Sequence, residues 1–158
     1  MAKVQLLSFS GKSLQRGFWL YVWEVNAADG RTILYVGRTG DSSSANAQSP
    51  YNRMGQHLGS NKNTNTLRRH LLSVGIDPNT CRTFEMIAYG PILPESATMV
   101  DHKPLRNKVA AMEKALCYAL RAAGYTVLKS VNSRQKLDDQ CWEEVLTAFT
   151  ERFPKLRA

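Results

Sequence analysis

The sequence predicts an α+β domain in which a small three-stranded antiparallel β-sheet is flanked by helices. Residues 18–25 and 32–37 are rich in aromatic and β-branched side chains, and the turn-forming residues 26–30 between them predict a β-hairpin. Residues 81–89 have a similar composition and are expected to form the third strand. Apolar residues recur at helical spacing from Leu105 onward, so the expected order of elements is β-β-α-α-β-α-(β)-α.

The length favours one domain. A chain of 158 residues has enough surface to bury for one ordinary hydrophobic core and is short for two full-sized domains. We therefore expect a single domain over residues 1–158. Residues 137–158 are expected to form a C-terminal covering helix, because apolar side chains recur there at helical intervals: Trp142, Val145, Leu146, Phe149 and Phe153.

Two helices are expected between the hairpin and the third strand. Residues 41–49 are small and polar and predict a mobile loop, after which Ser49 and Pro50 have the residue types of a helix N-cap and first helical position. Gly59 is the expected end of this helix. The second helix is expected to end at Gly75 and to turn three apolar side chains inward: Leu67, Leu71 and Val74.

The second half of the chain is expected to be dominated by one long helix. Residues 90–104 contain three prolines and are expected to be irregular, which places His102 in a loop. The long helix then runs from Leu105 to near Gly124, and residues 125–131 are expected to form a short extended segment.

The cysteines and the hydropathy pattern indicate a cytoplasmic protein. The three cysteines are odd in number and contain no C-x-x-C pair, which argues against a disulfide framework and against a structural zinc site. The N-terminal residues do not form the apolar core of a signal peptide, and no apolar stretch approaches the length of a membrane span. We expect no membrane partner.

The charge indicates a polyanionic partner. The net charge is +8, and the positive excess lies before residue 137, because residues 137–158 contain five acidic and three basic side chains. Such a field concentrates polyanions near the protein and favours contacts with phosphate groups. Nucleic acid is the expected partner. The alternative is that the basic side chains only keep the protein in solution.

Two short motifs lie on the predicted hairpin. Tyr35-Val36-Gly37-Arg38-Thr39 ends the second strand, and Trp19-Leu20-Tyr21 lies on the first. Three further residues follow on later elements: Arg53, Glu113 and Asn132. In their order and element types, these residues resemble the GIY-YIG nuclease family over residues 17–133. The first motif lacks its glycine, and Trp23 is the alternative to Tyr21 at its last position.

The resemblance implies a metal-dependent endonuclease. In this family one tyrosine, here Tyr21 or Tyr35, polarises or deprotonates the attacking water, and a glutamate, here Glu113, binds a single divalent metal ion. Mg²⁺ is the expected ion and Mn²⁺ the alternative. Because an unperturbed tyrosine titrates near pH 10, a base role requires a cation that lowers its pKa, such as Arg38, Arg53 or the metal.

The residue types are also consistent with phosphodiester chemistry by themselves. Arg53 and His57 are four residues apart and fall on one helix face, where an arginine binds phosphate oxygens and a histidine moves a proton near neutral pH. Glu113 borders the buried stripe of the long helix, where a carboxylate needs a cation. The alternatives are packing for the two tyrosines, a solvated face for Arg53 and His57, and a salt bridge for Glu113.

Double-stranded DNA is the expected substrate, ahead of RNA. Residues that are expected to contact its backbone are Arg38, Lys62, Arg68 and Arg69, while sequence specificity would come from the loops at 41–49 and 90–104. A homodimer is expected if both strands are cut. Two other functions remain open: a non-catalytic nucleic-acid-binding module on the same scaffold, and a protein-interaction domain that uses the C-terminal stripe.

Overall fold

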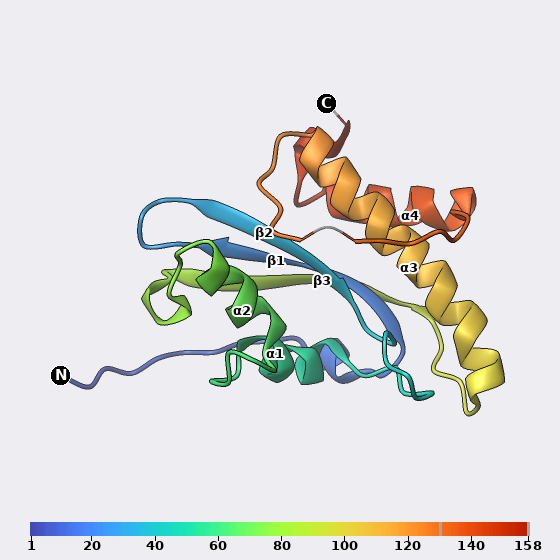
Figure 1. Ribbon diagram of the computed structural model, residues 1–158, viewed down its shortest axis with the longest axis horizontal. Helices are drawn as coiled ribbons and strands as arrows, with labels where there is room; N and C mark the ends of the chain where they lie inside the picture. The colour runs from blue at the N-terminus through green and yellow to red at the C-terminus, as the bar shows by residue number, and fades with distance from the viewer. Residues whose placement is uncertain (130, 158) are drawn as a thin grey trace.

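A computed structural model describes residues 1–129 and 131–157. Its centre is a sheet of three antiparallel strands, β1 (Phe18–Asn26), β2 (Thr32–Arg38) and β3 (Thr83–Leu93), in the order β2-β1-β3 (Figure 1). The predicted α+β fold with a three-stranded antiparallel sheet flanked by helices is confirmed. Because β1 is central and helices cover both faces of the sheet, β1 is apolar on both sides rather than alternating.

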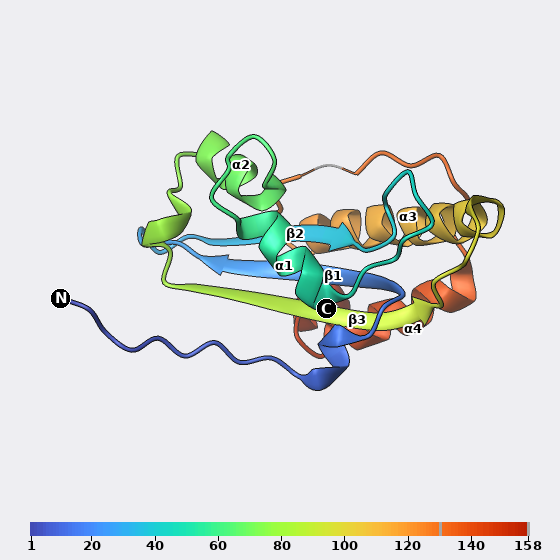
Figure 2. The same cartoon turned by 90° about the horizontal axis from the view of Figure 1, so that it is seen from below.

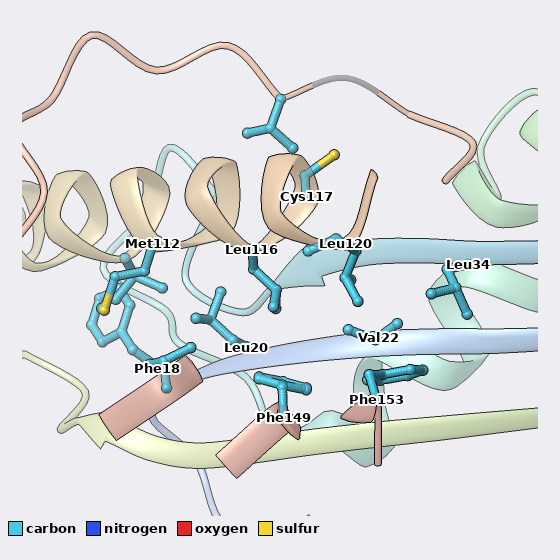
Figure 3. Close-up of a cluster of buried hydrophobic side chains, with 14 of the residues drawn as sticks. Phe18, Leu20, Val22, Leu34, Met112, Leu116, Cys117, Leu120, Phe149 and Phe153 are labelled. Carbon is cyan, nitrogen blue, oxygen red and sulfur yellow. The ribbon is translucent and has the colours of Figure 1, made fainter. Parts of the chain in front are cut away.

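Four helices cover the two faces of the sheet (Figures 1 and 2). The short helices α1 (Pro50–Leu58) and α2 (Thr66–Ser73) lie on one face. The longer α3 (Met99–Ala122) and α4 (Asp139–Thr150) lie on the other. Side chains from the sheet and from both long helices pack together there, including Phe18, Leu20, Val22, Met112, Leu116 and Phe149 (Figure 3).

Helix α1 begins as the sequence predicts. The Ser49 side chain accepts a hydrogen bond from the backbone N–H of Asn52, and Pro50 occupies the first helical position. Gly59 follows the last helical residue. For α2 the prediction that Val74 points inward is wrong: Val74 is 39% exposed, because the helix ends at Ser73 before the apolar stripe reaches it.

The region from residue 90 to residue 104 is irregular only at residues 94–98, so the prediction of an irregular segment is wrong for the residues on either side. Strand β3 continues through Pro91 to Leu93, and α3 begins at Met99, where the Thr98 side chain caps the N–H of Asp101. Pro104 lies within α3 and removes the hydrogen bond to the carbonyl of Val100. Both residues are exposed at this end of the helix, so water can hydrate the freed carbonyl.

The outer edge of β2 is covered by residues 126–128. The backbone N–H of Leu34 donates to the carbonyl of Thr126, and the N–H of Leu128 donates to the carbonyl of Leu34. Leu34 and Val127 form a parallel bridge. The predicted extended segment at 125–131 is therefore present at its first residues, and its residue 130 lies outside the described residues, as does residue 158 at the chain end. None of the helices in the described ranges is long and apolar enough to cross a lipid bilayer.

His102 is buried in α3, where the sequence analysis expected a loop. Its ring packs against Phe18 with 5.1 Å between ring centroids, and neither ring nitrogen has a hydrogen-bond partner within the described residues. A buried polar group without a partner destabilises the folded state. We therefore expect His102→Leu to raise the free energy of unfolding by about 1 kcal/mol.

Chemical denaturation of the wild type, His102→Leu and His102→Gln measures this effect. The glutamine variant retains an unsatisfied polar group in a similar volume, so it is expected to be less stable than the leucine variant. A leucine variant that is less stable than the wild type would show that the imidazole has a stabilising partner.

Candidate active site

Five of the six candidate catalytic residues lie together beside the middle of the β1–β2 hairpin. They are Tyr21 on β1, Tyr35 on β2, Arg53 and His57 on α1, and Glu113 on α3. Four of these side chains are nearly inaccessible to solvent, with exposed fractions of 0% for Tyr21, 2% for Tyr35, 2% for His57 and 4% for Glu113. Only Arg53 reaches the surface, with its side chain 20% exposed.

Tyr21 connects the sheet to α1. Its Oη lies 2.7 Å from Nε2 of His57, and Nε of Arg53 donates to the same oxygen at 3.4 Å. Trp23 lies on the same face of β1 but its ring is 6.4 Å from that of His57, and its Nε1 has no hydrogen-bond partner in the described part of the chain. Tyr21, rather than Trp23, therefore contributes a polar group to the cluster.

Gly37 makes room for Tyr21. The two residues face each other in the antiparallel register of β1 and β2. A Cβ atom on Gly37 would lie 2.5 Å from the ring and the hydroxyl oxygen of Tyr21, which is closer than carbon atoms approach. The glycine of the second motif thus has a packing role: it lets the phenol lie flat against the β2 backbone and reach α1.

Lys129 is a member of the cluster that sequence reasoning missed. Its Nζ donates to Oη of Tyr35 at 3.5 Å, lies 3.7 Å from Oε1 of Glu113, and stands over the Tyr35 ring at 5.2 Å from the centroid. Residues 126–128 carry it there by pairing with Leu34 on β2. Its place within the expected extended segment 125–131 was the only available signal, because pairing between distant segments has no local pattern.

Glu113 is held by two cations. Nε of Arg38 donates to Oε2 at 2.7 Å, and Lys129 faces Oε1 at a distance beyond hydrogen bonding. Arg38, which was expected to guide the nucleic-acid backbone, therefore neutralises a buried carboxylate, and its Nη1 is buried without a hydrogen-bond partner in the described chain. A salt bridge at Glu113 was one of the predicted alternatives, and it is present.

The donor set at Glu113 fits a divalent ion that is held mainly by water and phosphate. Oε1 accepts no hydrogen bond from the described residues, so one carboxylate oxygen is available. Within the described ranges no three His, Cys, Asp or Glu side chains lie close enough to form a complete metal site. Mg²⁺ commonly binds through one or two carboxylates with water and substrate phosphate as its other ligands.

Arg53 forms the rim of the cluster and is already bound to a carboxylate. Its Nη2 lies 3.0 Å from Oδ2 of Asp41, which belongs to the loop after β2, and its Nη1 donates to Gln56 at 2.9 Å. Gln56 in turn donates to Gln48 at the other end of that loop. A pocket of about 110 Å³ lies beside Arg53 between this loop and α1. The carboxylate of Asp41 stands where a phosphate oxygen would bind the guanidinium.

Burial controls the proton equilibria of the cluster. Burial raises the pKa of Tyr21 above its usual range and outweighs the opposing charge of Arg53, and burial together with the charge of Glu113 raises the pKa of Tyr35. Burial, followed by the charge of Arg53, lowers the pKa of His57 to about 3. Arg53 does act to lower the pKa of both tyrosines, as a base role would require, but burial outweighs it. Both phenols and the imidazole are therefore neutral near pH 7.

The remaining predicted residues lie outside the cluster. Asn132 is exposed beside Lys114 and Arg134, and no described contact joins it to the tyrosines. Arg68 donates to the carbonyls of Leu58 and Gly59 and so caps the end of α1. Two others, Lys62 and Arg69, are exposed on the surface around α2. The backbone-binding role of these three basic residues stays a prediction.

Comparison with protein families, with curated proteins and with solved structures found no match for this chain. The resemblance to GIY-YIG nucleases therefore rests on the motif residues alone.

The contact between Gly37 and Tyr21 makes a stability prediction. Gly37→Ala forces the buried ring or the β2 backbone to move, so it should lower the free energy of unfolding by about 1–3 kcal/mol. Gly55→Ala is the matched control, because Gly55 lies within α1 with nothing near its Cβ position. That variant should gain about 0.5–1 kcal/mol from helix propensity. Equal stability of the two variants in denaturant titrations would contradict the contact.

His57 makes a second prediction, for stability against pH. Its pKa is about 3 in the folded protein and 6.5 when unperturbed, so the unfolded chain binds the proton more tightly. The stability present above pH 6.5 is therefore lost as the pH falls from 6.5 to 3, by up to about 1.4 kcal/mol per pH unit. Denaturant titrations across this range should show that His57→Gln removes that part of the slope. His70→Gln, at a partly buried ring, should retain it; a slope unchanged in His57→Gln would refute the assignment.

Proposed function

We propose that this chain is a metal-dependent endonuclease that hydrolyses nucleic-acid phosphodiester bonds. The observation that supports this most directly is the convergence of Tyr21, His57 and Arg53 in one hydrogen-bonded group, beside Tyr35 and Glu113. The five residues come from three consecutive elements, β1, β2 and α1, and from the more distant α3. Together they provide proton-transfer groups, a phosphate ligand and a metal ligand, which are the components that phosphodiester hydrolysis requires.

Arg53 would bind the scissile phosphate. Its guanidinium can donate two hydrogen bonds to non-bridging oxygens, which become more negative as water attacks phosphorus. The phosphate would replace the carboxylate of Asp41, the present acceptor. Tyr35 would add a hydrogen bond from its neutral hydroxyl, because its raised pKa keeps the proton on the oxygen.

Tyr21 and His57 would move the proton of the attacking water. As the water oxygen bonds to phosphorus and the bond to the leaving oxygen breaks, Tyr21 Oη accepts a proton from water and passes its own to Nε2 of His57, 2.7 Å away. The imidazole is neutral near pH 7, so Nε2 has a free lone pair, and the low pKa of His57 means that it holds the proton only briefly before releasing it to solvent. The leaving oxygen is protonated by solvent. In this scheme Tyr21 is a relay rather than a pre-formed phenolate.

Glu113 would hold the metal ion through Oε1, with Mg²⁺ favoured and Mn²⁺ as the alternative. Bound there, the ion would supply positive charge to the phosphate oxygens. Arg38 would keep the carboxylate ionised and oriented through Oε2. Lys129, which now faces Oε1, would move away when the ion binds there, or would remain as a second cation beside Tyr35.

The net charge of +8 and the exposed basic residues support nucleic acid as the partner, and double-stranded DNA is the proposed substrate. Cutting both strands with one site per chain favours a homodimer. The cysteines are free in the described structure, which is consistent with the proposed location in the reducing cytoplasm.

A second candidate function is nucleic-acid binding without catalysis. The specific observation in its favour is that Tyr21 has no exposed surface and Glu113 is already paired with Arg38. A binding module would show salt-dependent affinity that neither EDTA nor a change at Glu113 removes. An endonuclease would lose turnover under both conditions while it keeps most of its affinity.

Cleavage of supercoiled plasmid, single-stranded DNA and structured RNA tests the proposal. We expect plasmid cutting with Mg²⁺ or Mn²⁺ and none with EDTA. Glu113→Gln and Tyr35→Phe should each lower the rate by on the order of 10²–10³-fold, because each removes a group that stabilises developing charge.

Tyr51→Phe is the matched control, since it removes the hydroxyl of an exposed tyrosine on α1. It should cut like the wild type. Thermal unfolding of each variant separates loss of chemistry from loss of fold. If the wild type binds all three nucleic acids and cuts none, the binding function replaces the enzyme. Cutting that survives EDTA would contradict the role of the metal.

A further inference from the structure

A basic groove lies on α3, on the side away from the sheet core. Residues 131–138 run back along α3 toward its N-terminal end (Figures 1 and 2), and Lys114 Nζ donates to the carbonyl of Ser133 at 2.8 Å. Two hollows of about 500 and 690 Å³ lie between this segment and the helix. We call this surface the α3 groove; its basic side chains are Lys103, Lys108, Lys114, Arg134 and Lys136.

The groove has little negative charge of its own. Lys108 is 2.9 Å from the carboxylate of Asp138. Three other cations, Lys103, Arg134 and Lys136, are exposed and have no ion pair within the described residues. Exposed cations in excess over acidic side chains produce a local positive field, which favours a polyanionic ligand.

The groove begins at the candidate active site. Lys114 follows Glu113 in α3, and Lys129, which contacts Glu113 and Tyr35, lies just before the segment that forms the opposite wall. From Lys114 to Lys103 is eleven residues, or roughly 16 Å of helix. This is about the length of five nucleotides at 3.4 Å per nucleotide. Lys103, Asn107 and Lys114 fall on one helix face at this spacing.

We propose that the α3 groove binds the phosphate backbone of the nucleic-acid strand beside the scissile phosphate. This inference rests on the proposed function and assigns the path of its substrate. The lining is mainly long cationic and amide side chains with no aromatic ring, so the groove suits backbone phosphates rather than bases. It is also distinct from the predicted contacts around α2, where Arg68 is engaged in capping α1.

The test is the salt dependence of binding to labelled duplex DNA of arbitrary sequence, with EDTA present so that nothing is cut. The groove variant combines Lys103→Gln, Arg134→Gln and Lys136→Gln. Each lost phosphate contact should reduce the slope of log K against log salt by about 0.9, so the three together should reduce it by about 2 to 3. Fluorescence anisotropy between about 50 and 200 mM salt covers the useful range.

The control variant combines Lys3→Gln, Lys12→Gln and Lys155→Gln, which remove the same charge from exposed positions elsewhere. Its slope should stay close to that of the wild type. A groove variant with the wild-type slope, or a control variant with an equal reduction, overturns the proposal.

The outcome also separates the groove from the catalytic proposal. If the wild type cuts DNA but the groove variant keeps its slope, the substrate path is wrong and the enzyme stands. If nothing is cut while only the groove variant loses slope, the groove stands as a binding surface and the catalytic proposal fails. Thermal unfolding confirms that both triple variants are folded.

Discussion

The contact between the Tyr21 ring and the bare backbone of Gly37 is the constraint on which the rest of the cluster depends. It sets the height of the phenol above the sheet, and the phenol in turn sets where His57 and Arg53 can lie, because both bond to its oxygen. Helix α1 is consequently held by a polar contact at one end of a mostly apolar interface. A buried hydrogen bond of this kind defines one docking geometry more sharply than apolar packing does, since distance and angle both matter.

The other side of the cluster depends on how the outer edge of β2 is closed. A backbone pairing at Leu34 carries Lys129 to the sheet, while α3 brings Glu113 to the same edge from the opposite layer. Arg38 and Lys129 therefore meet one carboxylate in a nearly dry environment, where an unpaired charge would be strongly destabilising. Residues 126–129 therefore both cover the outer edge of β2 and help to neutralise the charge of Glu113.

Much of this arrangement is local in the sequence and was predicted from it. The hairpin, the Ser49 cap of α1 and the five clustered site residues follow from turn chemistry, capping and motif order. Lys129 and the buried position of His102 do not, because both result from contacts between distant segments. The helical start at Met99 is not evident from the sequence, because prolines usually interrupt helices, whereas Pro104 lies near an exposed helix end where its missing N–H is tolerated. The pKa values of Tyr21 and Tyr35 are raised because their side chains are deeply buried, and the spacing of residues in the sequence does not reveal that depth.

Asp41 gives the loop after β2 a second property. Its carboxylate pairs with the guanidinium of Arg53 and so competes with any other anion for it. The same loop is also attached to α1 by the hydrogen bond between Gln48 and Gln56. Any anion that takes Arg53 must release Asp41, so anion binding and loop order are thermodynamically linked. This linkage is reciprocal. A partner that draws the loop away from α1 would raise the affinity of Arg53 for an anion, and the anion would raise the affinity of the protein for that partner by the same factor. Arg53 is thus paired with a carboxylate of its own chain until an anion of higher affinity displaces it.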